Sequence, residues 1–319
     1  REFGLEVFEK HGVLTVGETI FVTPEEGLRY TATDRHELDM VFHFAHMGVD
    51  NINNKWFIIP FRPRRLKLIL DQWQRGLEPN GWNALYLENH DQPRSLSRFG
   101  DDKKYREESA KMLSALLLLQ RGTPFIYQGQ EIGMSNARFE ELSQYRDVET
   151  KNIYQIGRKR LKLSHRRMMK KIKYMSRDNA RTPMQWDDTT FAGFSEKASW
   201  IDVNPNKDYV NVKAQEKNPH SILNFYRQLI EIRQSSQALK EGDYELYFKR
   251  HRRLYCFSRK SGDEMYLVLA NYAKKATRFG MPKELKNYAF KLILSNYEHS
   301  SKDDITVLKP YEVRIYSKR

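Results

Sequence analysis

The 319-residue chain is expected to form an α/β structure followed by an antiparallel β domain. Short apolar runs alternate with helix-forming stretches between residues 12 and 128, a pattern typical of a βα-barrel or a doubly wound sheet. From Asp243 the pattern changes to short alternating runs separated by turn residues, which favours antiparallel strands. The sequence therefore predicts two domains, residues 1–242 and residues 243–319.

The α/β part begins with four strand-like runs and the helical stretches between them. The runs are predicted at 12–17, 39–45, 83–88 and 124–128. Helices are predicted near 24–31, 65–77 and 103–120. The third of these helices has a broad apolar face. Four such units are half of an eightfold barrel.

After Ile132 the alternation stops. Residues 137–180 are interpreted as a largely helical, charged insertion, and residues 182–219 as loops with turn punctuation. Ser221 is the expected N-cap of an amphipathic helix that runs to Arg233. Five strands are then predicted at 244–248, 254–257, 265–269, 290–294 and 312–316.

The formal net charge of +14 is concentrated in one stretch, with ten Lys or Arg and no acid from Arg158 to Arg177. Such a stretch is either a nucleic-acid-binding helix or a solvated helix face. Apolar residues are interleaved among the charges, and no aromatic stacking platform accompanies them. The interpretation is a solvated helix face, with no nucleic-acid partner expected.

Cysteine content and hydropathy limit the classes of protein further. The single Cys256 excludes an internal disulfide and gives no metal-site spacing. No apolar run reaches the roughly 18–20 residues that cross a bilayer. The first residues do not have the pattern of a signal peptide. We therefore expect a cytoplasmic protein with no membrane partner and no metal.

Two acidic residues follow two of the predicted strands. The apolar run that ends at Leu87 continues into a polar cluster that contains His90, Asp91 and Arg94. The run at 12–17 leads directly to Glu18. Because the carboxyl ends of parallel strands meet at one end of a barrel, these positions suggest a carboxylate pair at its mouth.

Four motifs carry a family resemblance. They are TVGET around Glu18, ENHDQPRSLSRFGDD around Asp91, GTPFIYQGQEIGMSN at 122–136 and RDNARTPMQWDD at 177–188. In this order and spacing the chain resembles the alpha-glucosidases of glycoside hydrolase family thirteen, in the oligo-1,6-glucosidase and dextran glucosidase branch. The resemblance implies the second half of a (β/α)8 barrel followed by a β-sandwich domain.

The resemblance also implies roles for five residues. Glu18 corresponds to the general acid/base and Asp91 to the carboxylate that stabilises the transition state. The substrate-binding residues would be His90, Arg181 at the bottom of the glucose pocket, and Phe44 lining the site. Without the resemblance, Glu18 would be taken for a surface residue. Arg181 could then pair with Asp178 or Asp187.

The family's nucleophile, an Asp after the fourth barrel strand, has no counterpart here, because only 17 residues precede Glu18. The family's calcium-binding loop would lie in the same absent part. We therefore expect the C-terminal part of a glucosidase, without cofactor or metal. It should be inactive alone, and the N-terminal half is a possible separate partner chain.

The expected substrate is a short oligosaccharide with a terminal α-linked glucose, and its linkage stays open. Departures from the family pattern at Ile20, Ala45, Glu88 and Gln130 bear on that linkage. Two alternatives are kept. One is a trehalose-6-phosphate hydrolase of the same fold, and the other is a non-catalytic, truncated half-protein.

Overall fold

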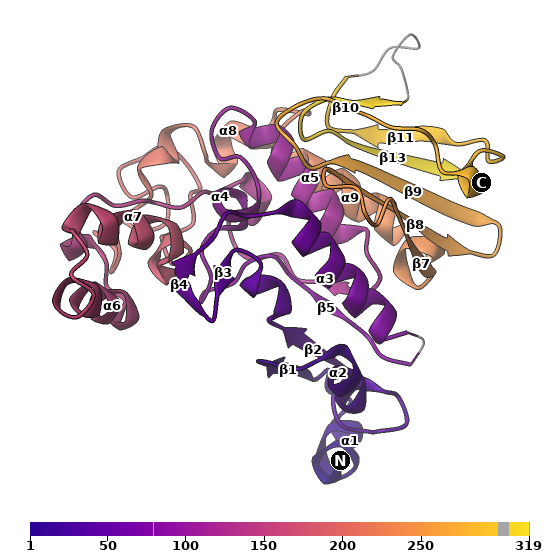
Figure 1. Ribbon diagram of the computed structural model, residues 1–319, viewed down its shortest axis with the longest axis horizontal. Coiled ribbons are helices and arrows are strands. Elements are labelled where there is room, and N and C mark those ends of the chain that lie inside the picture. Colours follow the sequence, from indigo (N-terminus) through magenta and orange to yellow (C-terminus); the bar gives the residue numbers. More distant parts are fainter. Residues whose placement is uncertain (79, 299–305, 319) are drawn as a thin grey trace.

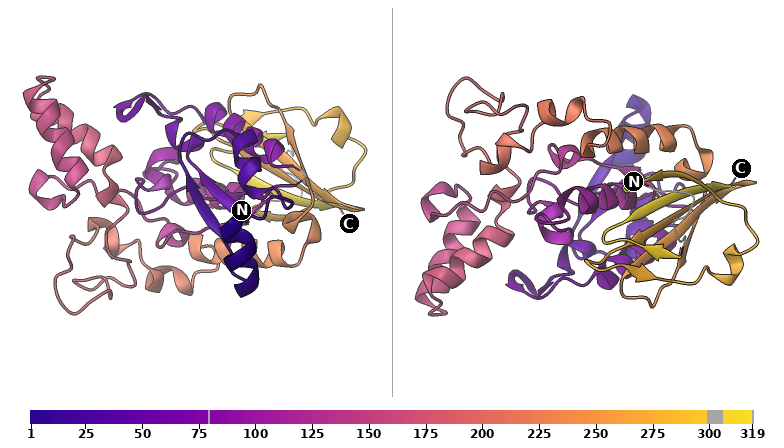
Figure 2. Two further views of the ribbon diagram at one scale, coloured as in Figure 1. Left: turned by 90° about the horizontal axis from the view of Figure 1, so that it is seen from below. Right: turned by 90° about the horizontal axis from the view of Figure 1, so that it is seen from above.

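The computed structural model describes residues 1–78, 80–298 and 306–318. In Figure 1 the parallel strands and their helices extend from the centre of the molecule to its lower end, where the chain begins. The C-terminal sheet lies on one side of that centre, and the helices α6 Val148–Lys159 and α7 His165–Met175 project from the other. Figure 2 shows the same three parts from below and from above. None of the described helices is long and apolar enough to cross a membrane.

Four short parallel strands form in the predicted places. They are β1 Val16–Thr19, β2 Met40–His43, β5 Ala84–Leu85 and β6 Thr123–Pro124. β1 pairs with β2, β5 pairs with β6, and a single parallel bridge from Val41 to Asn83 connects the two pairs. The order is therefore β1-β2-β5-β6, and β1 and β6 are its edges.

β1 starts four residues later than predicted, for a local reason. The chain begins with a π-helix, η1 Gly4–Phe8, and one turn of helix, α1 Glu9–His11. Gly12 ends that turn with a φ of 58°, a left-handed conformation that glycine adopts at helix ends without steric cost. The extended backbone therefore begins only after this cap.

The predicted helices are confirmed, and their caps follow sequence rules. Thr23 and Glu26 form a capping box at the start of α2, and the Ser221 hydroxyl accepts from the Asn224 backbone N–H at 3.1 Å at the start of α9. The longer helices of the centre are α2 Pro24–Thr31, α3 Pro63–Gly76, α5 Arg106–Leu118 and α9 Ile222–Gln234. Short helices are α4 Ser95–Phe99, α8 Val212–Glu216 and α10 Gln237–Lys240.

The C-terminal part is an antiparallel sheet with the order β11-β13-β9-β8-β7. Its strands are β7 Asp243–Tyr247, β8 Leu254–Ser261, β9 Glu264–Asn271, β11 Lys291–Ser295 and β13 Val313–Lys318. The five predicted strands are confirmed. A second layer over the sheet holds a two-stranded sheet and a 3-10 turn. These are β10 Thr277–Arg278, β12 Val307–Leu308 and η7 Lys283–Leu285.

The five-stranded sheet is apolar on both faces. One face joins the core formed by α3, α5 and α9, where Leu66, Leu116 and Val268 share a single buried cluster. The other face, which includes Cys256, packs under the second layer, so Cys256 behaves as a small apolar residue. The sheet is thus anchored on the helices of the α/β part, and the division at residue 242 stays a prediction.

Lys67 on α3 adds a polar connection between the two parts. Its ammonium group donates to the carbonyl oxygens of Phe248, His251 and Leu254 at 2.7–2.8 Å. The side chain is buried, and three acceptors satisfy the three donors that a lysine carries. Burial lowers the pKa of Lys67 to about 8.

The insertion is helical, as expected, and contains α6 Val148–Lys159 and α7 His165–Met175. Asp147 caps α6, and Ser164 caps α7. Their apolar faces share a buried cluster with Trp56 on a hairpin of the α/β part. The strands of that hairpin are β3 Asn51–Ile52 and β4 Asn54–Ile58.

A buried histidine after β2 predicts acid sensitivity. His46 is 1% exposed and donates from Nε2 to the Tyr86 carbonyl oxygen at 2.9 Å. Burial, followed by the charge of Arg98, lowers the pKa of His46 from 6.5 to about 3. Between these values the unfolded chain binds a proton that the folded chain does not. The free energy of unfolding should therefore fall as pH decreases, by about 1.4 kcal/mol per pH unit for this ring.

Urea unfolding at pH 7, 6 and 5 measures this dependence. His46→Gln, which keeps an N–H donor, should show a shallower decline than the unchanged chain, and buried His43 supplies the remainder. His220→Gln, at an exposed position, is the matched control and should keep the full decline. Equal slopes for the two variants would show that His46 is not the acid-sensitive group.

Candidate active site

The polar cluster after β5 is built on a buried ion pair. Glu88 and Arg94 are both almost fully buried and contact each other at 3.0 Å. The second Glu88 oxygen accepts from the Ser95 backbone N–H at 2.5 Å. A buried charge needs such pairing, so this pair fixes the turn that carries Asp91. Glu88, where the sequence departs from the family pattern, thus has a structural role.

Asp91 is held from one side by two arginines. Arg181 Nη2 donates to Asp91 Oδ1 at 2.7 Å, and Arg177 Nη1 donates to the same oxygen at 3.1 Å. Arg181 Nε also donates to the His90 carbonyl oxygen at 2.8 Å. The structure therefore brings together His90, Asp91 and Arg181, three of the five residues selected from the sequence.

The second oxygen of Asp91 stays accessible. Among the described residues its only contact is His90 Nε2, at 3.6 Å, and the Asp91 side chain is 35% exposed. The two guanidinium groups therefore fix the orientation of the carboxylate through Oδ1. The arrangement presents one carboxylate oxygen to a ligand, and a sugar hydroxyl is a donor that such an oxygen can bind.

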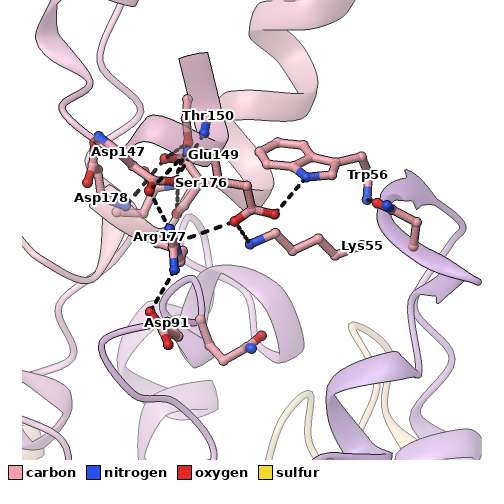
Figure 3. A network of polar contacts seen from close by, with 12 residues as sticks. Lys55, Trp56, Asp91, Asp147, Glu149, Thr150, Ser176, Arg177 and Asp178 are labelled. Carbon is pink, nitrogen blue, oxygen red and sulfur yellow. Dashed lines mark hydrogen bonds and ion pairs between the residues drawn. The ribbon is translucent and has the colours of Figure 1, made fainter. Parts of the chain in front are cut away.

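Arg177, which sequence analysis did not select, connects Asp91 to the insertion (Figure 3). Its Nη2 donates to Asp147 at 2.6 Å, and its Nε lies 3.4 Å from Glu149. Glu149 in turn accepts from the Trp56 indole N–H at 3.1 Å. The sequence did contain a signal for Arg177, which is the first residue of the RDNAR motif. Arg177 is also the last cation of the basic stretch, which was interpreted as a solvated helix face.

The charges of this network stabilise one another. Burial alone would raise the pKa of Asp147, but hydrogen bonds from Arg177 and Thr150 outweigh it and lower the pKa. The hydrogen bond to Asp147 correspondingly raises the pKa of Arg177. Both groups are therefore ionised near neutral pH, and Arg177 is fixed in position before any ligand arrives.

Arg181 does not pair with Asp178 or Asp187, the two partners expected if its role were purely structural. Asp178 accepts from the backbone N–H groups of Arg146 and Asp147 at 2.6 and 2.8 Å. Asp187 accepts from Thr189. Backbone donors thus hold one oxygen of Asp178, and Arg181 binds Asp91 instead.

Glu18 lies on the edge strand β1 and is exposed. Its register partner is Phe42 on β2. After burial, the charge of Glu18 is the next largest cause that raises the pKa of Tyr86. Within the described ranges no direct contact joins Glu18 to Asp91. The structure therefore places Glu18 on β1, separated by β2 from the strand β5 that leads to Asp91, and not in the arginine network.

Phe44 belongs to an aromatic group at the same ends of the strands. Its ring centroid lies 6.0 Å from that of Tyr86. Phe42 contacts Tyr86 at 5.2 Å and Phe125 at 4.6 Å, both edge to face. Phe42, Phe44 and Phe125 are only partly buried. The side of the four strands that carries Glu18 therefore presents apolar rings as well as a carboxylate.

The network around Arg177 predicts different consequences for the two arginines. Arg177→Gln leaves buried Asp147 with Thr150 as a hydrogen-bond partner and with only the more distant Arg181, at 3.8 Å, as a counter-charge. The free energy of unfolding should fall by about 1–3 kcal/mol, less than for a fully buried pair because the Arg177 side chain is 27% exposed. Arg181→Gln should lower the free energy of unfolding by less than about 1 kcal/mol, because Arg181 lies farther from Asp147, at 3.8 Å.

Chemical unfolding of the two variants side by side measures this difference. The midpoint should decrease clearly for Arg177→Gln and only slightly for Arg181→Gln, with unchanged slopes. An equal decrease for both would mean that Arg177 does not stabilise the insertion through Asp147.

Comparison with known proteins defines the family. The family model described as "Alpha amylase, catalytic domain" matches residues 1–242. The chain therefore belongs to the alpha-amylase family, as the four motifs suggested, and has an alpha-amylase-type fold with a C-terminal β domain.

Individual relatives are similar along the whole chain. The chain is 44% identical to an oligo-1,6-glucosidase of Parageobacillus thermoglucosidasius, over 100% of this chain and 57% of the relative. It is 39% identical to a trehalose-6-phosphate hydrolase of Bacillus subtilis, over 99% of this chain and 57% of the relative. It thus spans little more than half the length of these relatives.

Solved structures give the same coverage. A trehalose-6-phosphate hydrolase of Bacillus licheniformis superimposes with a TM-score of 0.94 at 39% identity, over 99% of this chain and 58% of that one. An isomaltulose synthase from Klebsiella superimposes with a TM-score of 0.93 at 33% identity, over 100% and 58%. The strands, helices and C-terminal sheet described above are thus shared with longer sugar-converting enzymes.

Proposed function

We propose that residues 1–242 form the second half of a (β/α)8 barrel, followed by a β-sandwich domain, and carry part of a retaining, exo-acting α-glucosidase site. The substrate would be a short oligosaccharide with a terminal α-linked glucose, as for an oligo-1,6-glucosidase. The observation that supports this most is Asp91, which follows a parallel strand with one oxygen bound by two arginines and the other open beside His90.

Each selected residue has a role in this proposal. Glu18 protonates the glycosidic oxygen as the bond breaks and later activates water. The Asp91 carboxylate stabilises the positive charge that develops on the sugar. His90 and Arg181 bind hydroxyl groups beside Asp91, and Phe44 lines the site. The reaction is acid–base and carboxylate chemistry and needs no cofactor.

The nucleophile would come from a segment that this chain does not contain. The other acids near Asp91 are engaged, since Arg177 holds both Asp147 and Glu149. The described structure also offers a place for such a segment, because β1 and β6 each have an unpaired edge. We propose that the remaining strands pair there, on the same or a separate chain, and that this chain alone is inactive.

Complementation tests the proposal. The purified chain is assayed alone and with the N-terminal part of the Parageobacillus oligo-1,6-glucosidase that the chain does not match. The substrate is p-nitrophenyl α-glucoside. The chain alone should show no turnover, and the mixture should approach the roughly 1 per second or more of ordinary enzymes. Turnover by the chain alone, or none in a mixture that forms a complex, would refute the proposal.

A trehalose-6-phosphate hydrolase is the second candidate, because the superposition on the solved Bacillus licheniformis hydrolase reaches a TM-score of 0.94. Isomaltose and trehalose 6-phosphate are therefore compared in the active mixture. The higher kcat/KM identifies the substrate class, since discrimination between substrates is a ratio of these constants. A ratio above about ten for isomaltose would support the first candidate.

A further inference from the structure

The basic stretch forms one wall of a cleft. A cleft of about 1080 Å³ lies between α7 and the segment that follows β4. Its lining contains seven Lys or Arg, one His and a single acid, Glu140. The Lys and Arg residues are Lys103, Arg138, Arg166, Arg167, Lys170, Lys171 and Lys173. Concave surfaces lined by one sign of charge concentrate the field and attract ligands of opposite sign.

The arrangement of these charges destabilises α7, the helix that carries most of them. His165, Arg166 and Arg167 occupy the first turn of α7, which has no acidic residue. Cations at a helix N-terminus oppose the macrodipole. Arg166 and Lys170, four residues apart, are in addition a like-charge pair. Helix stability therefore does not explain this sequence, and an anion in the cleft would relieve both repulsions.

Only part of the charge is neutralised within the protein. Lys173 pairs with Glu140, and Arg138 pairs with Asp102 at 2.5 Å. For Lys103, Arg166, Arg167 and Lys170, the described ranges of the chain contain no ion-pair or hydrogen-bond acceptor for the side-chain cation. These four side chains are exposed. The cleft thus holds a group of uncompensated cations rather than a set of internal salt bridges.

We propose that this cleft binds a linear polyphosphate, a flexible chain of closely spaced phosphate groups. Phosphates in a row match several cations along one helix, and lysine and arginine are the usual residues that bind them. The inference does not depend on the glucosidase proposal, and it replaces the interpretation of the basic stretch as a merely solvated face.

The lining argues against two other polyanions. Single-stranded nucleic acid needs rings on which its bases stack, but Phe61 already packs against Phe99 and Tyr272 at 5.4 and 5.7 Å. Tyr174 is fixed through its hydroxyl to Asp50, and the His165 ring packs edge to face against Tyr154 at 5.8 Å. A bilayer presents a broad surface to a protein, whereas these cations line a concavity.

Fluorescence anisotropy with end-labelled polyphosphate of uniform length tests the proposal on the full chain. Binding should weaken steeply between about 50 and about 200 mM salt, with a log–log slope of about 2 for three neutralised phosphates. The variant Arg166→Glu/Arg167→Glu/Lys170→Glu should bind at least about 30-fold more weakly. Because acids suit a helix N-terminus, α7 should remain folded, which circular dichroism checks.

The control variant Lys240→Glu/Lys283→Glu/Lys286→Glu changes the net charge equally at exposed positions outside the cleft. It should change the affinity less than about 3-fold. Equal weakening by both variants would show that net charge alone attracts the polymer and would overturn the proposed site. Absence of binding, or tighter binding of single-stranded RNA or of phosphatidylserine vesicles than of polyphosphate, would overturn the proposed ligand.

Discussion

In a complemented complex, Glu18→Gln and Asp91→Asn should each lower turnover of isomaltose by about 10²–10⁴-fold, with little change in substrate binding. Both carboxyl groups act on charge that develops only as the glycosidic bond breaks, so their loss affects kcat more than affinity. Glu25→Gln, an exposed carboxylate on α2, is the control and should retain full activity.

Substrates with different leaving groups distinguish the proton-donor role of Glu18 from the stabilising role of Asp91. Glu18→Gln keeps the shape of the side chain but removes the proton donor. A glucoside whose leaving group needs no protonation should therefore be cleaved much faster than isomaltose by Glu18→Gln. Asp91→Asn should show much less rescue, because the oxocarbenium-like charge develops with either leaving group. Equal rescue, or greater rescue of Asp91→Asn, would show that Glu18 is not the acid.

Without added partner, the chain should self-associate through the edge at β1. This edge strand has no neighbour on its outer side in the described structure, and unpaired strand edges favour association. Leu14 and Phe21 beside it are 68% and 97% exposed. Sedimentation velocity should show concentration-dependent oligomers. Leu14→Ser/Phe21→Asn should raise the midpoint concentration about tenfold or more, because apolar burial at the contact is reduced.

A matched substitution distinguishes association through the β1 edge from nonspecific association through other exposed apolar residues. Val148 and Ile156 on α6 are also exposed apolar residues, and Val148→Ser/Ile156→Ser should leave the midpoint unchanged. The Leu14/Phe21 variant should also complement more weakly, since the same surface would receive the added strands. A monomeric unchanged chain with a single cooperative unfolding transition would contradict this account of the edge.

The sequence located the elements more accurately than their ends. Apolar runs identified four parallel strands because buried strands must be apolar, and Ser221 was recognisable as a cap from its local sequence. The late start of β1 depends on Gly12, whose left-handed conformation is decided by the helix before it. Strand lengths depend on neighbouring strands, which a single run of residues does not specify.

The candidate site was predicted only in part, because a single run of residues does not specify its contacts with distant segments. His90, Asp91 and Arg181 lie in recognisable motifs, and the structure brings them together. Arg177 was not selected, because its inward contacts are with Asp147 and Glu149, about thirty residues earlier. Nothing in a run of ten cations indicates which of them turns inward. Only the packing of the insertion on the β3–β4 hairpin decides that.

We propose that this chain supplies the acid and the stabilising carboxylate, while another segment supplies the nucleophile. A glucosyl fluoride with a second ring fluorine forms the covalent glycosyl–enzyme and slows its hydrolysis, so the labelled carboxylate can be identified by peptide mass spectrometry. In the complemented complex the label should lie on the added N-terminal part, with none on residues 1–319. A label on Asp91, or on any other carboxylate of this chain, would contradict the account.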